Sequence, residues 1–366
     1  MRRDELAAWL RLGATPGLGR GTARRLLAAF GLPHAVLGQD DEALAHLATD
    51  AQLRALRAAP PGFDALLEAT WAWLQRGEGS HGILTLADSG YPPNVLQTAD
   101  PPLMLYVRGQ PPATWPRALA VVGSRNATAQ GLQNARQFAR AFAQAGYTVV
   151  SGLALGIDGA AHEGALEGAA ADALATIAVV GTGLDRTYPA RHAQLADRIA
   201  QRGLVVSEYP LGTEPLAENF PRRNRILSAL ASGALVVEAA LQSGSLVTAR
   251  LAAEQGRDVF AIPGSIHSAQ SRGCHALIKQ GAKLVETAQD VLEELGAQAS
   301  AAPAAMEASA DTPLLQALGF DPVAIDALVA RTGIAPSVLQ AQLLELELEG
   351  RVARLPGGLF QRVDQG

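Results

Sequence analysis

The sequence of 366 residues predicts an α/β fold in which a helical domain precedes a central parallel sheet and a small unit follows it. Three observations support this prediction. Short apolar runs alternate with helical patterns from Ala118 onward, which is typical of βαβ units. Amphipathic helices broken by Gly and Pro precede these runs. A stretch rich in Ala, Ser and Pro, without periodicity, follows them.

These changes of pattern divide the chain. We expect a helical domain at 1–80, a central domain at 81–295, a linker at 296–310 and a last domain at 311–366. Within the central domain, residues 82–109 alternate apolar and polar positions and are rich in Pro, which predicts strands and turns, and we expect 82–117 to form an extension of the domain.

The composition excludes several classes of protein. With 48% hydrophobic and 18% charged residues the chain is globular, and it has no apolar run long enough to cross a membrane. Its single cysteine excludes a disulfide framework and a cysteine zinc site. Residues 1–20 lack the apolar core of a signal peptide, so we expect a cytoplasmic protein without a membrane partner.

The distribution of charge matters more than its total. The net charge of −5 disfavours nucleic acid, although the basic residues are 28 arginines and only two lysines. Residues 1–30 carry six arginines and two acids, whereas residues 31–80 carry three arginines and seven acids. Any DNA binding is therefore confined to a basic N-terminal arm and to local clusters of arginine.

The first such cluster follows a tight turn. Two predicted helices are joined by a Pro-Gly-Leu-Gly turn at 16–19, which resembles a helix-hairpin-helix. Glycines there expose backbone N–H groups that a phosphate can accept. The candidate secondary DNA contacts are Gly17, Gly19, Arg20, Arg24 and Arg25. A plain turn between two helices of a bundle is the alternative.

Six apolar runs predict the strands of the central sheet. Because they are short and predominantly apolar without alternating, they are expected to be buried on both faces, as in parallel sheets. The runs are Ala118–Gly123, Thr148–Gly152, Thr176–Gly181, Leu204–Ser207, Ala234–Glu238 and Asp258–Pro263. The carboxyl ends of parallel strands meet at one edge, where ligands of such folds bind.

Residues suited to anions follow these strands. Gly123 permits a close backbone approach, Ser124 offers a hydroxyl, and Arg125 offers a planar fork for a phosphate. A second Gly/Ser turn at Ser243, Gly244 and Ser245 begins another helix. The segment lacks both the GxGxxG fingerprint and a Walker lysine, so no dinucleotide or nucleotide cofactor is expected. Ordinary strand-to-helix turns are the alternative.

A third group lies at the start of a further helix. Arg222, Arg223, Asn224 and Arg225 place three cations where the helix dipole disfavours them, and an anionic partner would relieve that cost. Phe220 beside them offers an aromatic face to a base. A solvated run of charge is the alternative.

No catalytic or metal site is expected. Asp158 and His162 share one helix face, but they lack a third ligand, and Asp158 also suits the positive end of its helix. For the loop with Arg186, Tyr188 and His192, the sequence favours neither a functional nor a purely structural role.

The C-terminal unit has the pattern of a winged helix. Val323–Thr332 and Ser337–Glu349 predict a helix-turn-helix, and residues 351–363 predict a two-stranded wing. The second helix carries Glu345, Glu347 and Glu349 but no Arg or Lys, so it would repel phosphates. We therefore expect this domain to contact protein rather than DNA.

The central motifs, read in order, resemble the DprA/Smf family of bacterial DNA-processing proteins. They are VVGSRNAT, VVSGLALGIDGAAHEGAL, VVGTGLDRTYPARH, VVSEYPLGTEPLAENFPRRNRILSAL, VVEAALQSGSLVTARLAAEQGRDVFAIPG and GCHALIKQGAKLV. The resemblance covers about 118–290, and 82–109 also fits. It implies a sterile-alpha-motif-like N-terminal domain, an extended Rossmann-like central sheet and a winged-helix domain.

The resemblance also implies a function. Members bind and protect single-stranded DNA, help to load the RecA recombinase during natural transformation, and work as homodimers through the central domain. By motif, the phosphate pocket maps onto Gly123–Arg125, Arg222–Arg225 and Ser243–Ser245, with Phe220 as a possible base contact. The family commonly has a lysine in the basic motif, which here holds only arginines. Ile278 and Leu284 are the apolar candidates for the dimer interface.

Phosphate-binding nucleosidases of Rossmann-like fold are the enzymatic alternative. Their motif resembles PGGxGTxxE, in which the final Glu serves catalysis. Aligning Ser243–Leu251 with that motif places Leu251 at the Glu position. A binding protein, not an enzyme, is therefore expected.

Deleting residues 300–366 is expected to leave the affinity for single-stranded DNA within a few-fold of that of the full chain, because the acidic last domain adds no phosphate contact. Fluorescence anisotropy with a labelled oligonucleotide measures this. A large loss of affinity would show that the last domain does bind the strand.

Overall fold

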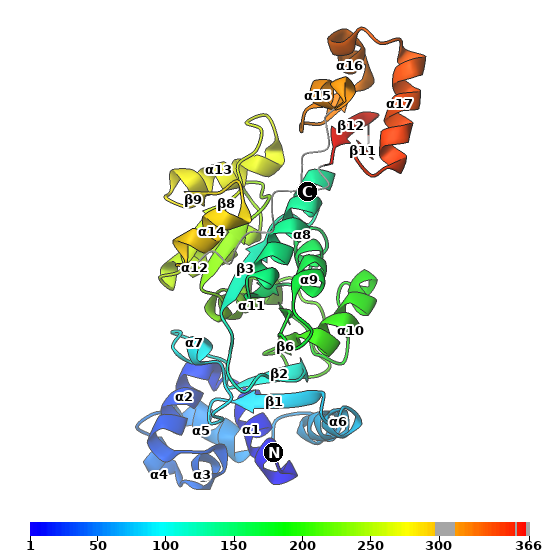
Figure 1. The fold of residues 1–366 in the computed structure, drawn as a ribbon. Coiled ribbons are helices and arrows are strands. Elements are labelled where there is room, and N and C mark those ends of the chain that lie inside the picture. Colours follow the sequence, from blue (N-terminus) through cyan, green and yellow to red (C-terminus); the bar gives the residue numbers. More distant parts are fainter. Residues whose placement is uncertain (297–311, 356, 364–366) are drawn as a thin grey trace.

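The computed structural model describes residues 1–296, 312–355 and 357–363 (Figure 1). The predicted linker at 296–310 lies, except for its first residue, outside the described residues. No helix in the described ranges is both long and apolar enough to cross a membrane.

One nine-stranded sheet forms the centre of the molecule. Its strands are β1 (His81–Thr85), β2 (Met104–Gly109), β3 (Ala118–Val122), β4 (Thr148–Ser151), β5 (Thr176–Val179), β6 (Leu204–Ser207), β7 (Gly233–Val236), β8 (Asp258–Ala261) and β9 (Lys283–Leu284). The spatial order is β1-β2-β6-β5-β4-β3-β7-β8-β9. Strands β3 to β9 pair in parallel, and β2 pairs antiparallel with both β6 and β1. The predicted parallel sheet is confirmed.

The order of the strands creates a crevice. From β3 the chain adds β4, β5 and β6 on one side, and it then returns to add β7, β8 and β9 on the other. Strands β3 and β7 are neighbours whose following loops diverge, with Val122 opposite Val236. Such a switch point leaves a crevice at the carboxyl ends of the strands.

Helices cover both faces of the sheet (Figure 1). They are α7 (Pro93–Leu96), α8 (Ala129–Gln144), α9 (Ile157–Gly168), α10 (Ala193–Arg202), α11 (Asn219–Leu230), α12 (Ser245–Glu254), α13 (Arg272–Lys279) and α14 (Ala288–Glu294), with short 3-10 turns η1 (Ala190–His192) and η2 (Ala269–Ser271). On β3, Leu119 and Val121 join one core with Phe142 of α8, whereas Ala120 joins the other core with Ile226 of α11. This two-sided burial is what the continuous apolar runs predicted.

The N-terminal domain is a small helical bundle. Its helices are α1 (Arg3–Ala14), α2 (Gly19–Phe30), α3 (Pro33–Gly38), α4 (Asp41–Leu44), α5 (Asp50–Arg57) and α6 (Phe63–Arg76). Trp9, Leu26 and Leu56 lie in its core. In the turn between α1 and α2, Gly17 and Gly19 have φ of 74° and 62°, a conformation that favours glycine.

The C-terminal domain is the predicted winged helix. Its elements are α15 (Pro313–Leu318), β10 (Val323–Ala324), α16 (Ile325–Thr332), α17 (Pro336–Leu348), β11 (Val352–Leu355) and β12 (Leu359–Arg362). The three strands pair in the order β10-β12-β11. Leu328 of α16 and Leu339 and Leu343 of α17 are fully buried in its own core.

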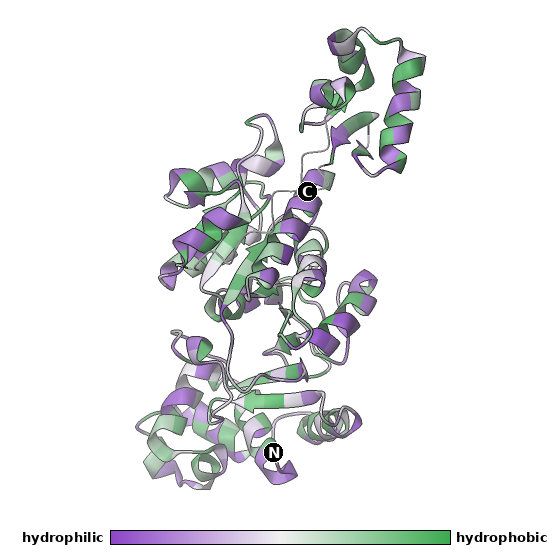
Figure 2. Ribbon diagram, viewed as in Figure 1, coloured by the Kyte–Doolittle hydropathy of each residue, from purple (hydrophilic) through white to green (hydrophobic). Residues whose placement is uncertain are grey.

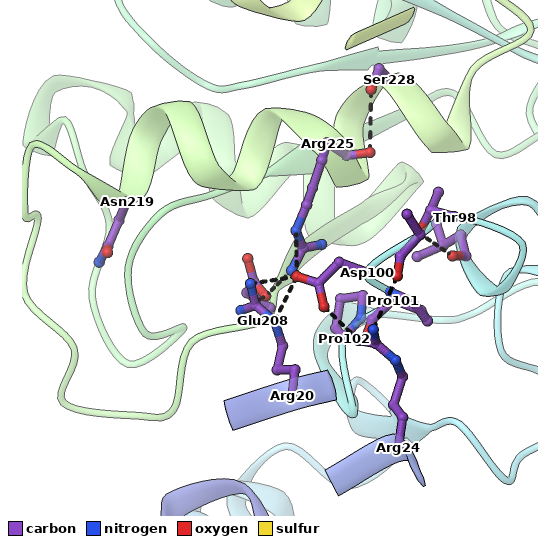
Figure 3. A network of polar contacts seen from close by, with 12 residues as sticks. Arg20, Arg24, Thr98, Asp100, Pro101, Pro102, Glu208, Asn219, Arg225 and Ser228 are labelled. Atoms are coloured by element: carbon purple, nitrogen blue, oxygen red, sulfur yellow. Dashed lines mark hydrogen bonds and ion pairs between the residues drawn. The ribbon is translucent and has the colours of Figure 1, made fainter. Parts of the chain in front are cut away.

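A network of charges with Glu208 at its buried centre joins the N-terminal domain to the central sheet (Figure 3). Glu208, directly after β6, has a side chain only 3% exposed and pairs with both Arg225 of α11 and Arg20 of α2. Arg20 also donates to Asp100 at 2.9 Å, and Arg24 of α2 pairs with the same carboxylate. The two acids thus bridge α2, α11 and the Pro-rich connector.

The electrostatics of the network follow from burial and pairing. Burial raises the pKa of Glu208, and the guanidiniums of Arg225 and Arg20 oppose that shift. Burial would also raise the pKa of Asp100, but hydrogen bonds from Arg20 and Arg24 outweigh it, and the pKa is lowered. Charged side chains at this depth persist because each has an opposite charge beside it.

Replacing Glu208 with Gln is expected to lower the free energy of unfolding by about 3 kcal/mol, because it leaves the nearly buried Arg225 without its main counter-ion. Urea denaturation measures the change. The matched control is Glu68→Gln, which breaks the exposed pair with Arg3 and is expected to cost about 0–1 kcal/mol. Equal effects of the two variants would show that the network contributes no more than a surface pair.

Candidate nucleic-acid interface

The crevice at the switch point is a cavity of about 640 Å³. Its walls come from the loop after β3, from the first turn of α11, and from the loop between β7 and α12. The lining residues fall within 122–126, 215–227 and 240–248, together with Ala154, Asp158, Tyr188 and Gln270. The sheet therefore brings together three segments that the sequence analysis selected separately.

The loop after β3 forms the first wall. A Cβ on Gly123 would lie 2.6 Å from Ile157 and 2.9 Å from the carbonyl oxygen of Glu238, so only glycine fits there. Ser124 is buried, and its Oγ accepts the Asn126 N–H at 3.1 Å. Arg125 is exposed. The tight packing of Gly123 holds the loop in place while the Arg125 side chain remains available.

Arg125 lies over an aromatic pair. Its guanidinium carbon is 5.5 Å from the centre of the Phe220 ring, and the Phe220 ring is 5.5 Å from that of Tyr188. The attraction between a cation and a ring face stabilises this arrangement. A charged fork and two aromatic faces therefore lie together at the mouth of the cavity.

Arg223 forms the floor of the cavity. It is 4% exposed, its Nη1 donates to the Gly152 carbonyl oxygen at 2.9 Å, and its Nε donates to Asn224 Oδ1 at 2.9 Å. A Cβ on Gly152 would lie 2.0 Å from Arg223 Nη2, so the guanidinium needs a glycine there.

Burial alters the ionisation of this floor but leaves it positive. It lowers the pKa of Arg223 to about 10, with the carboxylate of Asp158 opposing the shift, so the guanidinium is a cation at neutral pH. Burial likewise raises the pKa of Asp158, against the effects of Arg223 and of backbone donors. Asp158 accepts the N–H groups of Gly152 and Ala154 and so secures the loop after β4.

The start of α12 forms the opposite wall. The hydroxyls of Ser243 and Ser245 are 2.7 Å apart, and Asn224 Nδ2 donates to the Gly244 carbonyl oxygen at 3.5 Å. Both α11 and α12 direct their N-terminal ends at the cavity, and a helix N-terminus carries partial positive charge. The predicted residues 123–125, Phe220, Arg223, Asn224 and 243–245 thus line one cavity.

The structure corrects the expectation for Arg225, whereas the expectation for Arg222 stays a prediction. Arg225 is absent from the lining and pairs with Glu208 and Asp100 on the other side of α11. Arg222 is exposed and pairs with Glu218 at 3.2 Å, also outside the lining. Successive residues of a helix point about 100° apart, so these four consecutive side chains do not all face the one cavity.

The N-terminal hairpin is corrected in part. Arg20 and Arg24 are held by Asp100 and Glu208, so they are not available to phosphates. Arg25 is exposed and donates to the hydroxyl of Thr22 at 3.1 Å. Gly17 and Gly19 do form the expected tight turn, and Gln52 donates to the Gly17 carbonyl oxygen at 2.9 Å. Arg20 and Arg24 thus dock the helical domain on the central domain.

Other lining residues were not assigned from the sequence. Tyr188 was noted only within an undecided loop, although that loop follows β5 at the same edge of the sheet. Thr248 follows the Gly/Ser turn and was noted there only as a further hydroxyl that suits an anion, whereas Gln270 gave no signal. His162 is fully buried outside the lining, and burial lowers its pKa to about 3, so it is neutral.

The residues assigned to a dimer interface lie away from the cavity. Leu284 is 45% exposed on β9, the last strand of the sheet, and Ile278 of α13 packs partly against the core. An edge strand has unpaired backbone groups that a second chain can complete.

Comparison with known proteins agrees with the fold and the motifs. Residues 82–296 match the family model for DNA recombination-mediator protein A, and residues 297–358 match that for the DprA winged helix domain. Protein Smf of Escherichia coli is 45% identical over 304 residues, which are 80% of each chain. DNA processing protein DprA of Streptococcus pneumoniae is 45% identical over 210 residues, which are 57% of this chain and 73% of the relative.

Two solved structures are also similar. That of DprA from Streptococcus pneumoniae has a TM-score of 0.62 and 35% identity, covering 80% of this chain and 98% of the other. The structure of DNA processing protein A from Helicobacter pylori was described for its mode of binding single-stranded DNA. It has a TM-score of 0.53 and 30% identity, covering 60% of this chain and 97% of the other. With its central sheet, its winged helix and relatives matched along most of their length, the chain belongs to the DNA recombination-mediator protein A family, also called DprA/Smf.

Proposed function

We propose that this protein binds single-stranded DNA in the cavity at the switch point between β3 and β7. The observation that supports it most is the convergence of a buried cation, Arg223, with the exposed Arg125 and the N-terminal ends of α11 and α12. Each favours a phosphate. The similar Helicobacter pylori protein is described as binding single-stranded DNA.

The residues of the cavity have distinct roles in this proposal. The fork of Arg125 makes a bidentate contact with one phosphate. The hydroxyls of Ser243 and Ser245 and the N-terminal end of α12 bind another. Arg223 stays fixed by Gly152 and supplies charge without reorganising.

The aromatic pair accounts for a preference for single strands. Phe220 and Tyr188 lie beside Arg125, and Tyr188 is 45% exposed. An unpaired base can stack on such a face, with a contribution of about 1–3 kcal/mol, whereas a base inside a duplex cannot reach it. The strand would thus bind by phosphate contact and by stacking, without reading its sequence.

We further propose that the protein acts as a homodimer, protects the bound strand and helps to load RecA. The exposed edge strand β9 with Leu284 supports the dimer. Two chains that join there would present two cavities to one strand, and paired weak sites gain affinity through effective concentration. Loading a recombinase requires a protein that holds a strand without modifying it.

The cavity favours binding over hydrolysis. Leu251 on α12 does not line it, and Asp158 is the one acid in the described lining. Because Asp158 already accepts two backbone N–H groups and is buried, it is poorly placed to act on a ligand.

Reversing the charge of Arg125 (Arg125→Glu) is expected to weaken binding of a single-stranded oligonucleotide by at least about tenfold, equivalent to about 1.4 kcal/mol. The slope of log affinity against log salt should become shallower by roughly 0.7 for each phosphate that the variant no longer neutralises. Fluorescence anisotropy at several salt concentrations measures both.

The matched control is Arg250→Glu, an exposed arginine of α12 outside the cavity that pairs with Glu254. It should change affinity by only a few-fold. Normal binding by Arg125→Glu would mean that the strand binds elsewhere. Repeated release of base from nucleoside monophosphates, abolished by Arg125→Ala, would identify an enzyme instead.

Replacing Leu284 with Glu is expected to shift the protein from dimer to monomer, because it puts a charge on the exposed edge strand. Sedimentation velocity measures the state. Leu132→Glu, on the exposed side of α8 and 37% exposed, is the control and should leave it unchanged. A dimer that persists in Leu284→Glu argues against β9 as the interface.

A further inference from the structure

Helix α17 of the winged-helix domain is apolar on two opposite faces. Leu339, Leu343 and Leu346 point into the core of the domain. On the other side Val338, Leu344 and Leu348 are 49%, 56% and 83% exposed. In Figure 2 apolar segments recur along the whole length of this helix. Solvation alone gives no reason for a second apolar face.

The exposed residues form one stripe. Positions 341, 344 and 348 are three and four residues apart, so they lie on successive turns of the same side, and Val338 lies three residues before Ala341 at the edge of that side. We call this stripe, with Glu345 within it, the α17 face. In a DNA-binding winged helix the corresponding helix meets the groove. In this domain the exposed side of that helix carries leucines instead of cations.

The charge of the α17 face is negative. Glu345 is exposed four residues after Ala341 and three before Leu348, so it shares their side. Residues 336–350 contain no Lys or Arg. The C-terminal end of the helix, which carries partial negative charge, lies at the same place. A leucine stripe with acids at one end matches an apolar surface with cations beside it.

We propose that the α17 face is a docking surface for a basic amphipathic helix of another protein. Such a helix would place its apolar side on Val338, Leu344 and Leu348 and an Arg or Lys on Glu345, as in the binding of helices to apolar grooves. This surface is separate from the cavity that we propose for DNA.

Other occupants fit less well. A phosphate backbone would meet carboxylates. A second copy would bring together two domains that each carry seven acids and four arginines between 311 and 366. Residues 297–311 of the same chain contain no Lys or Arg, so they offer no cation to Glu345.

The test uses the full chain, without DNA, and two labelled synthetic helices of about 18 residues, long enough to fold in water. Both carry leucine along one side. One carries arginine on the flanks, and the other carries glutamate. Fluorescence anisotropy should show saturable binding of the basic peptide and binding of the acidic one weaker by at least about tenfold.

Variants locate the binding surface. The double change Leu344→Gln and Leu348→Gln removes the apolar anchors but keeps the charge. It should weaken the binding of the basic peptide by at least about tenfold. Glu345→Gln should weaken the binding of this peptide by a smaller factor and make the affinity depend less on salt concentration. Ile266→Gln, at a 74% exposed position of the central domain, is the matched control and should have no effect. Circular dichroism verifies that each variant is folded.

Four results would overturn the proposal. Equal binding of both peptides would indicate unspecific adhesion to leucine, and full binding by the double variant would place the peptide elsewhere. A self-association of the wild type that the double variant lacks would make the occupant a second copy. A loss of affinity for duplex DNA in the double variant would show that the occupant of the α17 face is DNA.

Discussion

The buried guanidinium of Arg223 is the interaction on which the candidate site depends. It joins the start of α11 to the loop after β4 through the Gly152 carbonyl oxygen, and Asp158 secures that same loop from α9. A cation at this depth needs fixed partners, and the absence of a side chain on Gly152 makes room for it. Because the floor is rigid and positive, the loops above it can hold an anion without rearranging.

Most arginines of the basic clusters serve to hold the chain together. Arg20, Arg24 and Arg225 meet Asp100 and Glu208 where the helical domain joins the sheet (Figure 3). These charges neutralise one another, so together they produce little electrostatic field that could attract a distant polyanion. The proposed DNA contact is accordingly local and comes from a few groups in one crevice, which agrees with a net charge of −5.

The two ends of the chain thus differ in purpose from the middle. Arg20 and Arg24 of the basic N-terminal arm are used in packing, and the acidic last helix exposes leucines such as Leu348. For the proposed function, the protein also needs surfaces that do not bind the strand. The α17 face and the edge strand β9 have this character, since one is acidic and the other ends the sheet.

The sequence by itself determined the fold class, most strands of the central sheet and the family. Continuous apolar runs such as Ala118–Val122 can be satisfied only when both faces are covered, so a parallel sheet followed from local pattern. It also located the Gly/Ser turns of the cavity, because those residues follow strands. The directions of the arginines were not determined in this way. Arg223 and Arg225 are two residues apart on one helix, yet one faces the crevice and the other faces Glu208. Only the tertiary structure decided between them, because the role of a charge depends on which distant groups the fold brings beside it.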